Sequence, residues 1–351
     1  MYYGATPTNP LELLVLATGQ APLPVIDGLF SLMKTRAIMA GVKLGVFEAL
    51  ADHPLPAGAV AAARGLDPES CELLLRALVF SGYLEQQGEL FSLSRLGRDS
   101  FLPGAAKDFR GYLLWNYTQW DLVQHLETLV KSGRGLDFHH TLADPEAWAN
   151  YQRAMAEFAR EDAPRVAKSV PLRPGARRLL DLAGGHGAYG AAICRRQPGM
   201  RSVVIDLPAA LAAGRALAAE MGHSELVEHR AGNLLTNDFE PGQDVVVLSH
   251  ILHHFKPEQN LAVLRKAFLA LEDGGSVAIW EIEAPDPKRS KADLGDGAAL
   301  FFRLTSNARA YHANDYAGWL TAAGFANIRA RRPLLTPGGL LLTARKPAAA
   351  R

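Results

Sequence analysis

Three histidines, His250, His253 and His254, stand together directly after an apolar run in the second half of the chain. A neutral imidazole can accept a proton near neutral pH, so these residues are candidate general bases. Their spacing could also suit a metal ion, but no Asp or Cys nearby completes a ligand set. We therefore expect acid–base chemistry here, without a metal.

A second group of candidate residues begins at Asp181, near the end of the apolar run RRLLDLA. The next residues read AGGHGAYG, so the spacing is Asp-x-Ala-x-Gly-x-Gly, ending at Gly187. Glycines after the first strand of a parallel sheet let a ligand approach the backbone closely. The following strand-like run ends in Asp206, whose carboxylate can accept hydrogen bonds from two vicinal ribose hydroxyls.

The elements that must position these residues alternate between strands and helices from Arg177 onward. Near-continuous apolar strands separated by helices predict a parallel sheet covered on both faces. Two final strand-like runs, joined through TPGG, predict an antiparallel edge. We expect an α/β domain over 171–351 with a Rossmann-like sheet of seven strands, within RRLLDLA, RSVVIDL, ELVEHRA, DVVVLSH, GSVAIWEI, ANIRARRPL and GGLLLTARK.

The first part of the chain reads mostly as helices. A helix capped by Asp67 and a hairpin turn at Gln87 and Gly88 are expected there. With the preceding helices, they predict an N-terminal all-α winged-helix domain over 1–108. Helical spacing also predicts one helix over 29–50, whose buried face would be Leu29, Leu32, Met33, Ile38, Val42, Leu44, Val46, Phe47 and Leu50.

Two longer amphipathic helices follow, over 109–133 and 144–170. Large aromatic side chains recur along both of them, and such residues either form a core or line a site for a flat organic ligand. We interpret 109–170 as a helical linker that contributes to a substrate pocket. The candidate lining residues on this linker are Trp115, Met155 and Phe158.

Composition favours a globular protein and excludes some classes of partner. Hydrophobic residues make up 48% and charged residues 21%, and the net charge is +1. A broad surface for nucleic acid or membrane needs an excess of Lys and Arg, so neither partner is expected. The two cysteines, Cys71 and Cys194, lie in apolar runs and are predicted to be reduced core thiols. Without a signal-peptide pattern or an apolar run of ~18 residues, we expect a cytoplasmic protein.

The order and spacing of these segments resemble the plant-type small-molecule O-methyltransferases, which use S-adenosylmethionine. The turn after Asp181 resembles their first motif, and VVIDLPAAL resembles their FDLP segment. HRAGNLLTNDF, VVVLSHILHHFKPE and GGSVAIWEIEAP take the places of GDMF, FLKWILHDWSDE and GKVIVAECILP. The resemblance covers most of the chain, in the style of the bacterial members. It implies a methyltransferase sheet, an N-terminal dimerisation domain and a homodimer.

This resemblance also implies a site for S-adenosylmethionine, with S-adenosylhomocysteine as the product. The candidate cofactor residues are Gly184, Gly185 and Gly187 around the methionine portion, Asp206 at the ribose, Leu207, Asn233 and Leu234 beside the adenine, and Ser249 near the cofactor.

Methyl transfer to a hydroxyl of a small aromatic molecule is the implied reaction. His253 falls on the catalytic histidine of the family, and Glu281 falls on the acid that orients it. A phenol with a pKa near ~10 is mostly protonated at pH 7, so a base helps the reaction. Glu283 remains an alternative partner, because side chains two apart on a strand share a face. His250 and His254 are candidates to line the pocket.

Four departures from the family pattern bear on this interpretation. Ala183 replaces a glycine, which the backbone tolerates if its φ is negative. Asn233 replaces an aspartate, although an amide oxygen can still accept a hydrogen bond. His254 replaces an aspartate, and Ala310 stands near the place of a second catalytic acid. His312 and Asp315 lie near that place but out of register. The polar segment 284–297 is expected to be a loop.

Other functions remain open at this stage. The same fold could methylate carbon or nitrogen, with His253 only positioning the acceptor. A member could also keep the cofactor and catalyse a cyclisation, rearrangement or decarboxylation. A ligand-sensing DNA-binding protein is disfavoured, because the presumed recognition helix ESCELLLRALVFSGY carries a single Arg and a mostly apolar face.

Overall fold

The structure is a computed structural model that describes residues 5–286, 288, 294–306, 308–334, 336 and 338–348. The chain divides into two compact units, Met1–Thr118 and Gln119–Arg351. The boundary falls inside helix α8 (Arg110–Val123). Most of the segment that we interpreted as a linker, 109–170, therefore belongs to the same unit as the large sheet.

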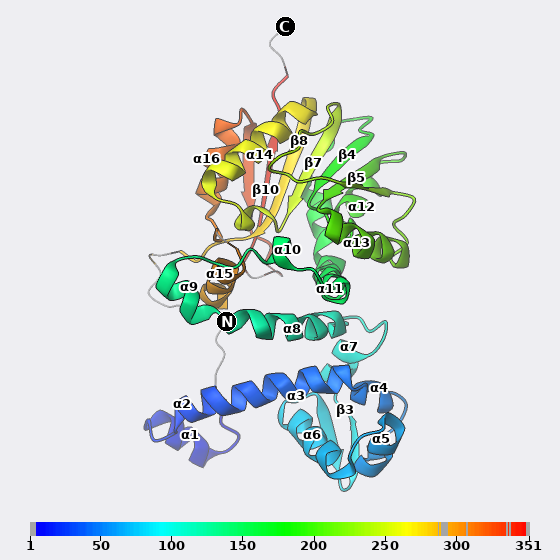
Figure 1. Cartoon of the computed structure of the whole chain (residues 1–351), viewed down its shortest axis with the longest axis vertical. Coiled ribbons are helices and arrows are strands. Elements are labelled where there is room, and N and C mark those ends of the chain that lie inside the picture. The colour runs from blue at the N-terminus through cyan, green and yellow to red at the C-terminus, as the bar shows by residue number, and fades with distance from the viewer. Residues whose placement is uncertain are drawn as a thin grey trace. The chain divides into compact units, whose positions relative to one another are not determined.

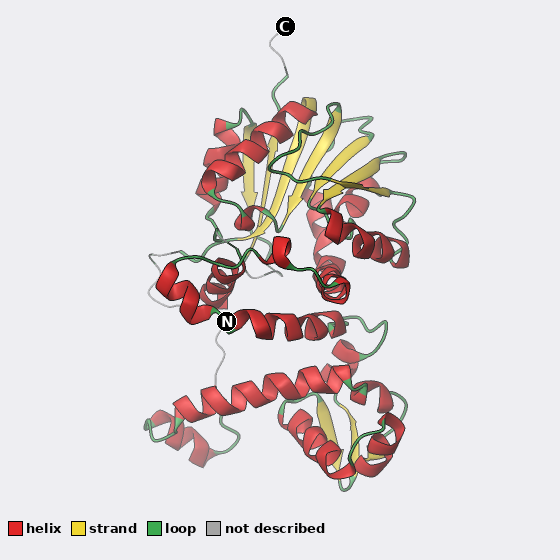
Figure 2. Cartoon of the chain, in the orientation of Figure 1, coloured by secondary structure: helices red, strands yellow, loops and turns green. Residues whose placement is uncertain are grey.

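The first unit combines helices with a small antiparallel sheet (Figure 2). Its strands pair in the order β1–β3–β2, and the predicted hairpin joins β2 to β3. Asp67 caps α6 as predicted, because its carboxylate accepts a hydrogen bond from the N–H of Ser70 at 2.8 Å. The elements are α1 (Pro10–Ala17), α2 (Leu23–Val25), the π-helix η1 (Ile26–Phe30), α3 (Ser31–Lys43), α4 (Val46–Ala49), β1 (Leu55–Pro56), α5 (Ala57–Arg64), α6 (Pro68–Phe80), β2 (Leu84–Gln87), β3 (Leu90–Leu93) and α7 (Arg95–Phe101).

The predicted single helix over 29–50 is wrong. The chain turns between α3 and α4 at Gly45, whose φ of 69° is a left-handed conformation that glycine adopts without strain. This turn directs Val46 and Phe47 into the core of the unit, where Ile38, Val42 and Leu50 are also buried. The rest of the predicted face, Leu29, Leu32, Met33 and Leu44, is exposed.

The second unit contains one seven-stranded sheet with the order β6–β5–β4–β7–β8–β10–β9 (Figure 1). The strands β4 to β8 pair in parallel, and β10 pairs antiparallel with both β8 and β9. Both the fold class and the antiparallel edge are therefore confirmed. The strands are β4 (Arg178–Leu182), β5 (Arg201–Asp206), β6 (Val227–Ala231), β7 (Gln243–Ser249), β8 (Leu271–Ile282), β9 (Ala326–Arg331) and β10 (Gly339–Arg345).

Helices in this unit differ from the predicted ones at two places. The expected helix over 109–133 is two helices, because α8 ends at Val123 and α9 begins at Leu126. Within the predicted loop 284–297, α15 already begins at Leu294, and residues 287 and 289–293 lie outside the described residues. The helices are α9 (Leu126–Ser132), α10 (Phe138–Thr141), α11 (Pro145–Ser169), α12 (Ala188–Cys194), α13 (Pro208–Glu220), η2 (Leu252–His254), α14 (Pro257–Ala270), α15 (Leu294–Thr305) and α16 (Ala313–Ala322).

Alternating side chains of the central strands pack into two separate hydrophobic cores, one on each face of the sheet. Val246 and Leu248 pack on the face covered by α14 and α16, whereas Val245 and Val247 pack on the face covered by α11 and α12. Figure 1 shows α14 and α16 on the opposite side of the sheet from α12 and α13. Burial on both faces explains why these strands read as continuous apolar runs.

The two cysteines are both free and buried, as predicted. None of the helices in the described part of the chain is long and apolar enough to span a bilayer.

Candidate active site

A buried histidine–glutamate pair lies just past the carboxyl ends of the central parallel strands. His253 belongs to the short helix η2 that follows β7, and Glu281 lies on β8. The Nδ1 atom of His253 is 2.7 Å from Oε2 of Glu281. The other oxygen, Oε1, accepts a hydrogen bond from the backbone N–H of Leu252 at 2.7 Å. Both oxygens of the carboxylate are thus fixed, and they fix the imidazole.

Burial determines the electrostatics of this pair. Glu281 is 0% exposed and His253 is 3% exposed. Burial lowers the pKa of His253 and raises the pKa of Glu281, because water no longer stabilises either charged form. His253 is therefore neutral at pH 7. With Nδ1–H donating to Glu281, Nε2 carries the free lone pair of the ring.

Glu283, which we had kept as an alternative partner for His253, has different contacts. Its carboxylate accepts hydrogen bonds from Arg332 at 2.5 and 2.7 Å and from the N–H of Ala313 at 3.1 Å. Strand β8 ends at Ile282, so the period of two no longer applies at Glu283. Glu281 is the acid that contacts His253.

Aromatic rings surround the imidazole of His253. The ring of His254 lies 4.1 Å from it and that of Phe302 lies 4.3 Å from it, measured between centroids. His139, from α10, packs edge-on against His254 at 4.4 Å and bonds to the hydroxyl of Tyr151 at 3.0 Å through Nε2. Burial lowers the pKa of both His139 and His254, so this group of rings is uncharged at pH 7.

The glycine turn after β4 packs tightly against its own domain. A side chain at Gly184 would overlap the carboxylate of Asp181, and one at Gly187 would overlap Val227. A side chain at Gly185 would overlap the amide of Gln152, a buried residue of α11. Gly184 is therefore required by the packing of the buried Asp181, whereas Gly185 and Gly187 have positive φ angles of 51° and 71° that side chains disfavour.

The carboxylate of Asp206, at the end of β5, is held by two backbone N–H groups. Oδ2 accepts a hydrogen bond from the N–H of Gly185 at 2.9 Å, and Oδ1 accepts one from the N–H of Leu207 at 2.7 Å. A carboxylate has about four acceptor positions, so each oxygen can accept a further bond. The carbonyl oxygen of Gly185 bonds to Nε2 of His229 at 2.9 Å, which holds the turn in place.

The loop after β6 carries two more of the predicted cofactor residues. The side-chain oxygen of Asn233 accepts a hydrogen bond from the N–H of Leu235 at 2.8 Å, so it already shapes the loop. The side chain of Leu234 packs in the hydrophobic core. Lys266 donates to the carbonyl oxygens of Leu234 and Asn237 at 2.5 and 2.7 Å and thereby ties this loop to α14.

Ser249 supplies an observation that points to a ligand. Its hydroxyl lies at the carboxyl end of β7, is buried, and has no hydrogen-bond partner within the described residues. A buried hydroxyl is costly to leave unpaired, so a ligand that bonds to it would stabilise the site. Together with the open acceptor positions on Asp206, this orphaned group fits a polar cofactor bound along the ends of β4, β5 and β7.

The predicted pocket residues fall into different places. Met155 is half-buried on α11, and Phe158 on the same helix is 42% exposed. Trp115 lies on α8, in the first unit. The ring of His250 lies 5.9 Å from that of Trp280 and 6.4 Å from that of Tyr189. The lining role of these residues stays a prediction.

The family has a second catalytic acid near the position of Ala310, and neither His312 nor Asp315 replaces it. Ala310 is buried, and Asp315 accepts a hydrogen bond from the N–H of His312 at the start of α16. Both residues that we noted nearby therefore cap a helix. In the residues that the structure describes, no group of three or more His, Cys, Asp or Glu side chains is placed to hold a metal ion.

Sequence reasoning did not select five residues that the structure brings to the site. None of them belongs to a sequence motif, and each contacts a residue from a distant segment of the chain. Helical spacing marked Tyr151 only as one of several aromatics. The five are His139, Tyr151, Gln152, His229 and Lys266.

Comparisons with known proteins identify the family of this chain. Residues 119–326 match the model of the O-methyltransferase domain, and residues 26–100 match the O-methyltransferase dimerisation domain. The chain therefore belongs to the O-methyltransferase family, and its class is that of the S-adenosylmethionine-dependent methyltransferases.

Individual relatives are similar along most of their length. The 3-hydroxy-5-methyl-1-naphthoate 3-O-methyltransferase of Streptomyces sahachiroi is 28% identical over 90% of this chain and 93% of its own. The L-tyrosine C(3)-methyltransferase of Streptomyces lavendulae is 25% identical over 93% and 94%. Human N-acetylserotonin methyltransferase, solved in complex with SAM, superposes with a TM-score of 0.80 at 20% identity, covering 99% and 100%, which shows a shared fold.

Proposed function

We propose that this protein transfers a methyl group from S-adenosylmethionine to a hydroxyl of a small aromatic molecule, with His253 as general base. The observation that carries the proposal is the buried contact of 2.7 Å between His253 and Glu281. Membership of the family supports transfer to oxygen. The naphthoate relative supports an aromatic acceptor.

The cofactor site would be built from the ends of neighbouring strands. S-adenosylmethionine, when bound, supplies a methyl group activated by a positively charged sulfur. Asp206 would accept hydrogen bonds from the ribose hydroxyls, and the unpaired hydroxyl of Ser249 would gain a partner. The remaining residues of this site are the backbone of Gly184, Gly185 and Gly187, with Leu207 and the loop at Asn233 on the adenine side.

His253 has the arrangement that a general base needs. Its Nε2 lone pair would accept the proton of the acceptor hydroxyl, while Nδ1–H keeps its bond to Glu281. The carboxylate holds the ring in one tautomer and stabilises the imidazolium once the proton has moved. The rings of Phe302 and His254 pack against the imidazole, which is 3% exposed, so the ring is shielded from solvent. General-base assistance of this kind contributes about 100- to 10,000-fold.

A flat acceptor suits the aromatic side chains near His253. His254 packs against the imidazole of His253, and His139 packs against His254. Such surfaces bury the faces of a planar ring and leave a few polar atoms to orient it.

Assembly would use the first unit. The match of residues 26–100 to the dimerisation domain supports a homodimer. The exposed Leu29, Leu32 and Met33 supply apolar surface for it. The free, buried thiols of Cys71 and Cys194 fit a reducing compartment, and we propose a cytoplasmic location.

The decisive experiment measures methyl transfer from labelled S-adenosylmethionine to a panel of phenols. His253→Ala and Glu281→Gln should each lower kcat by about 100-fold or more, because the base or its orienting acid is lost. Binding of S-adenosylhomocysteine, measured by calorimetry, should be unchanged. His53→Ala, an exposed histidine of the first unit, is the matched control. Full turnover by His253→Ala would remove the general base from the mechanism.

Methylation of carbon is a second candidate, because the relative from Streptomyces lavendulae is a C(3)-methyltransferase. An activated phenol also directs reactivity to its ring carbons, so the same base would serve. The carbon chemical shift of the transferred methyl group in the product separates an oxygen-bound methyl from a carbon-bound one.

A further inference from the structure

We propose that His254 determines which acceptors the protein prefers, by hydrogen-bonding a second hydroxyl next to the one that receives the methyl group. This inference rests on the proposed function, because it places the first hydroxyl at His253. His254 directly follows His253 in the short helix η2, and the centroids of their rings lie 4.1 Å apart. The acceptor class is then an aromatic ring with hydroxyls on two adjacent carbons.

The ring of His254 carries an unsatisfied polar atom. Its Nδ1 atom is buried and has no hydrogen-bond partner among the residues that the structure describes. The recorded contacts of the ring are with two other imidazoles, those of His253 and His139. A buried polar atom is costly to leave unpaired, so a ligand atom that bonds to this ring stabilises the site.

His254 also has surface to offer a ligand. The residue is half-buried, whereas His253 is 3% exposed. The torsion that turns an imidazole about its bond to Cβ has broad minima, so Nδ1 can turn toward the open side at small cost. A ligand beside His253 therefore reaches the His254 ring without displacing the core.

Two elements outside η2 fix the position of this ring. His139, on α10, packs edge-on against His254 with centroids 4.4 Å apart. The Nε2 atom of His139 is in turn 3.0 Å from the hydroxyl of Tyr151 on α11. A side chain that selects a ligand must be held by its neighbours, and these contacts hold His254 beside the base.

A neutral hydroxyl is the substituent that suits this ring. Burial, together with the neighbouring imidazoles of His253 and His250, lowers the pKa of His254, so the ring is uncharged at pH 7. A neutral imidazole has one N–H donor and one lone pair, and either nitrogen can carry the proton. A hydroxyl both donates and accepts, so it pairs with Nδ1 in either tautomer. A carboxylate only accepts and an ammonium only donates.

The arrangement of the two rings selects adjacent positions on the acceptor. The imidazoles of His253 and His254 lie side by side, with their planes inclined by 48°. Two hydroxyls that bond to neighbouring imidazoles must themselves be neighbours. A second hydroxyl at the far end of a fused ring system would point away from η2.

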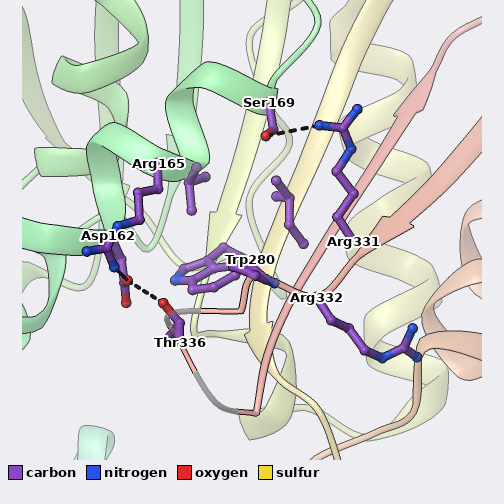
Figure 3. A pocket seen from close by; sticks show the side chains of 10 residues that line it. Asp162, Arg165, Ser169, Trp280, Arg331, Arg332 and Thr336 are labelled. Atoms are coloured by element: carbon purple, nitrogen blue, oxygen red, sulfur yellow. Dashed lines mark hydrogen bonds and ion pairs between the residues drawn. The ribbon is translucent and has the colours of Figure 1, made fainter.

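Packed side chains fill the opposite side of β8. Trp280 packs with α11 and α12 and is 1% exposed. Figure 3 shows its indole among side chains of α11 that include Asp162 and Ser169. Glu281 is the next residue of the strand, and successive side chains of a strand point to opposite faces. An acceptor at His253 therefore meets the rings of η2 and not the indole.

Calorimetry on the full chain saturated with S-adenosylhomocysteine tests the inference without turnover. The probes are 2,3-dihydroxynaphthalene, 2,7-dihydroxynaphthalene and 2-naphthol. The 2,3-isomer should bind about tenfold or more tightly than the other two, because only it offers an adjacent hydroxyl to His254. His254→Phe keeps an aromatic ring and should bind all three probes alike. His254→Asn, whose amide donates and accepts, should restore part of the preference.

The matched control is His140→Phe, which changes an exposed histidine on α10 and should keep the full preference. Thermal unfolding midpoints check that each variant is folded, and His254→Asn carries the comparison if His254→Phe is not. Equal Kd values for 2,3-dihydroxynaphthalene and 2-naphthol in the wild type would overturn the inference. A preference that survives in His254→Phe, or a 2,7-isomer that binds as tightly as the 2,3-isomer, would do the same.

The inference and the proposed function fail separately in these measurements. His253→Ala should lose methyl transfer and keep the tenfold preference in binding, because His254 is intact. A wild-type chain that methylates phenols without this preference would remove the role of His254 alone. A chain that shows the preference in binding but methylates none of the phenols would remove the proposed activity alone.

Discussion

Two residues of the site adopt backbone conformations that their own side chains disfavour. Ala183 has a φ of 54° and His250 has a φ of 53°. The condition under which we expected the backbone to tolerate alanine at position 183, a negative φ, is therefore not met. Each follows one of two neighbouring strands, β4 and β7. Their N–H groups donate to the carbonyl oxygens of Ile205 and Trp280, at 2.7 and 2.8 Å. Such strain costs about 1–3 kcal/mol and is typical of ligand sites, because the surrounding structure over-determines the backbone.

The titration of Asp206 leads to a prediction about pH. Burial raises its pKa to about 6, against the opposing effect of two backbone N–H donors. Above pH 6 the ionised carboxylate can accept the ribose hydroxyls, and below pH 6 protonation removes an acceptor. We expect the Kd for S-adenosylhomocysteine to rise as the pH falls from 7.5 to 5, approaching about tenfold per pH unit below the pKa.

Calorimetry at several pH values checks this expectation. Asp206→Asn should bind more weakly at pH 7.5 and should lose the dependence on pH. A wild-type Kd that stays constant between pH 7.5 and pH 5 would contradict the ribose-binding role of Asp206.

At the scale of elements, glycines differ in whether the surrounding structure leaves room for a side chain. Gly318 lies inside α16 with open space around its missing side chain. Gly318→Ala should raise the free energy of unfolding by about 0.5–1 kcal/mol, because alanine favours the helix. Gly184→Ala should lower it by about 1–3 kcal/mol, because the methyl group would overlap Asp181. Denaturant unfolding of both variants measures the difference, and a stabilising Gly184→Ala would refute the packing argument.

At the scale of the whole molecule, the apolar surface of the first unit is the feature that a monomer leaves unexplained. Besides Leu29, Leu32 and Met33, it includes Phe30 and three leucines of α1, Leu11, Leu13 and Leu14. Isolated apolar residues on a surface are normal, but a continuous group indicates an interface. The family model for dimerisation covers part of the same segment.

Sedimentation equilibrium tests this interface. If the proposed homodimer uses this surface, Leu32→Glu should weaken it by about thirtyfold or more, because a charge would be buried at the contact. Leu269→Glu, at a position that is 72% exposed on α14, adds the same charge elsewhere and should leave the dimer intact. A Leu32→Glu variant that assembles like the wild type would place the interface elsewhere.

The sequence by itself predicted the seven strands, the antiparallel edge, the glycine turn after Asp181, and Asp206 and His253 as site residues. These signals are local, because apolar period, strand-end acids and turn residues act within a few positions of each other. Residues 185–190 also satisfy GxGxxG, so glycine spacing alone does not choose between a dinucleotide and S-adenosylmethionine. The match over 119–326 makes that choice.

Only the tertiary structure decided between Glu281 and Glu283 as the partner of His253, since both acids have the same local pattern. It also brought His139 next to His254 and Gln152 onto Gly185, across more than 30 residues of chain in each case. The break at Gly45 and the positive φ of Ala183 likewise appear only in the structure. Contacts between distant segments depend on how whole elements pack. The hydrophobic period of one segment predicts that it has a buried face, but not which other element packs against that face.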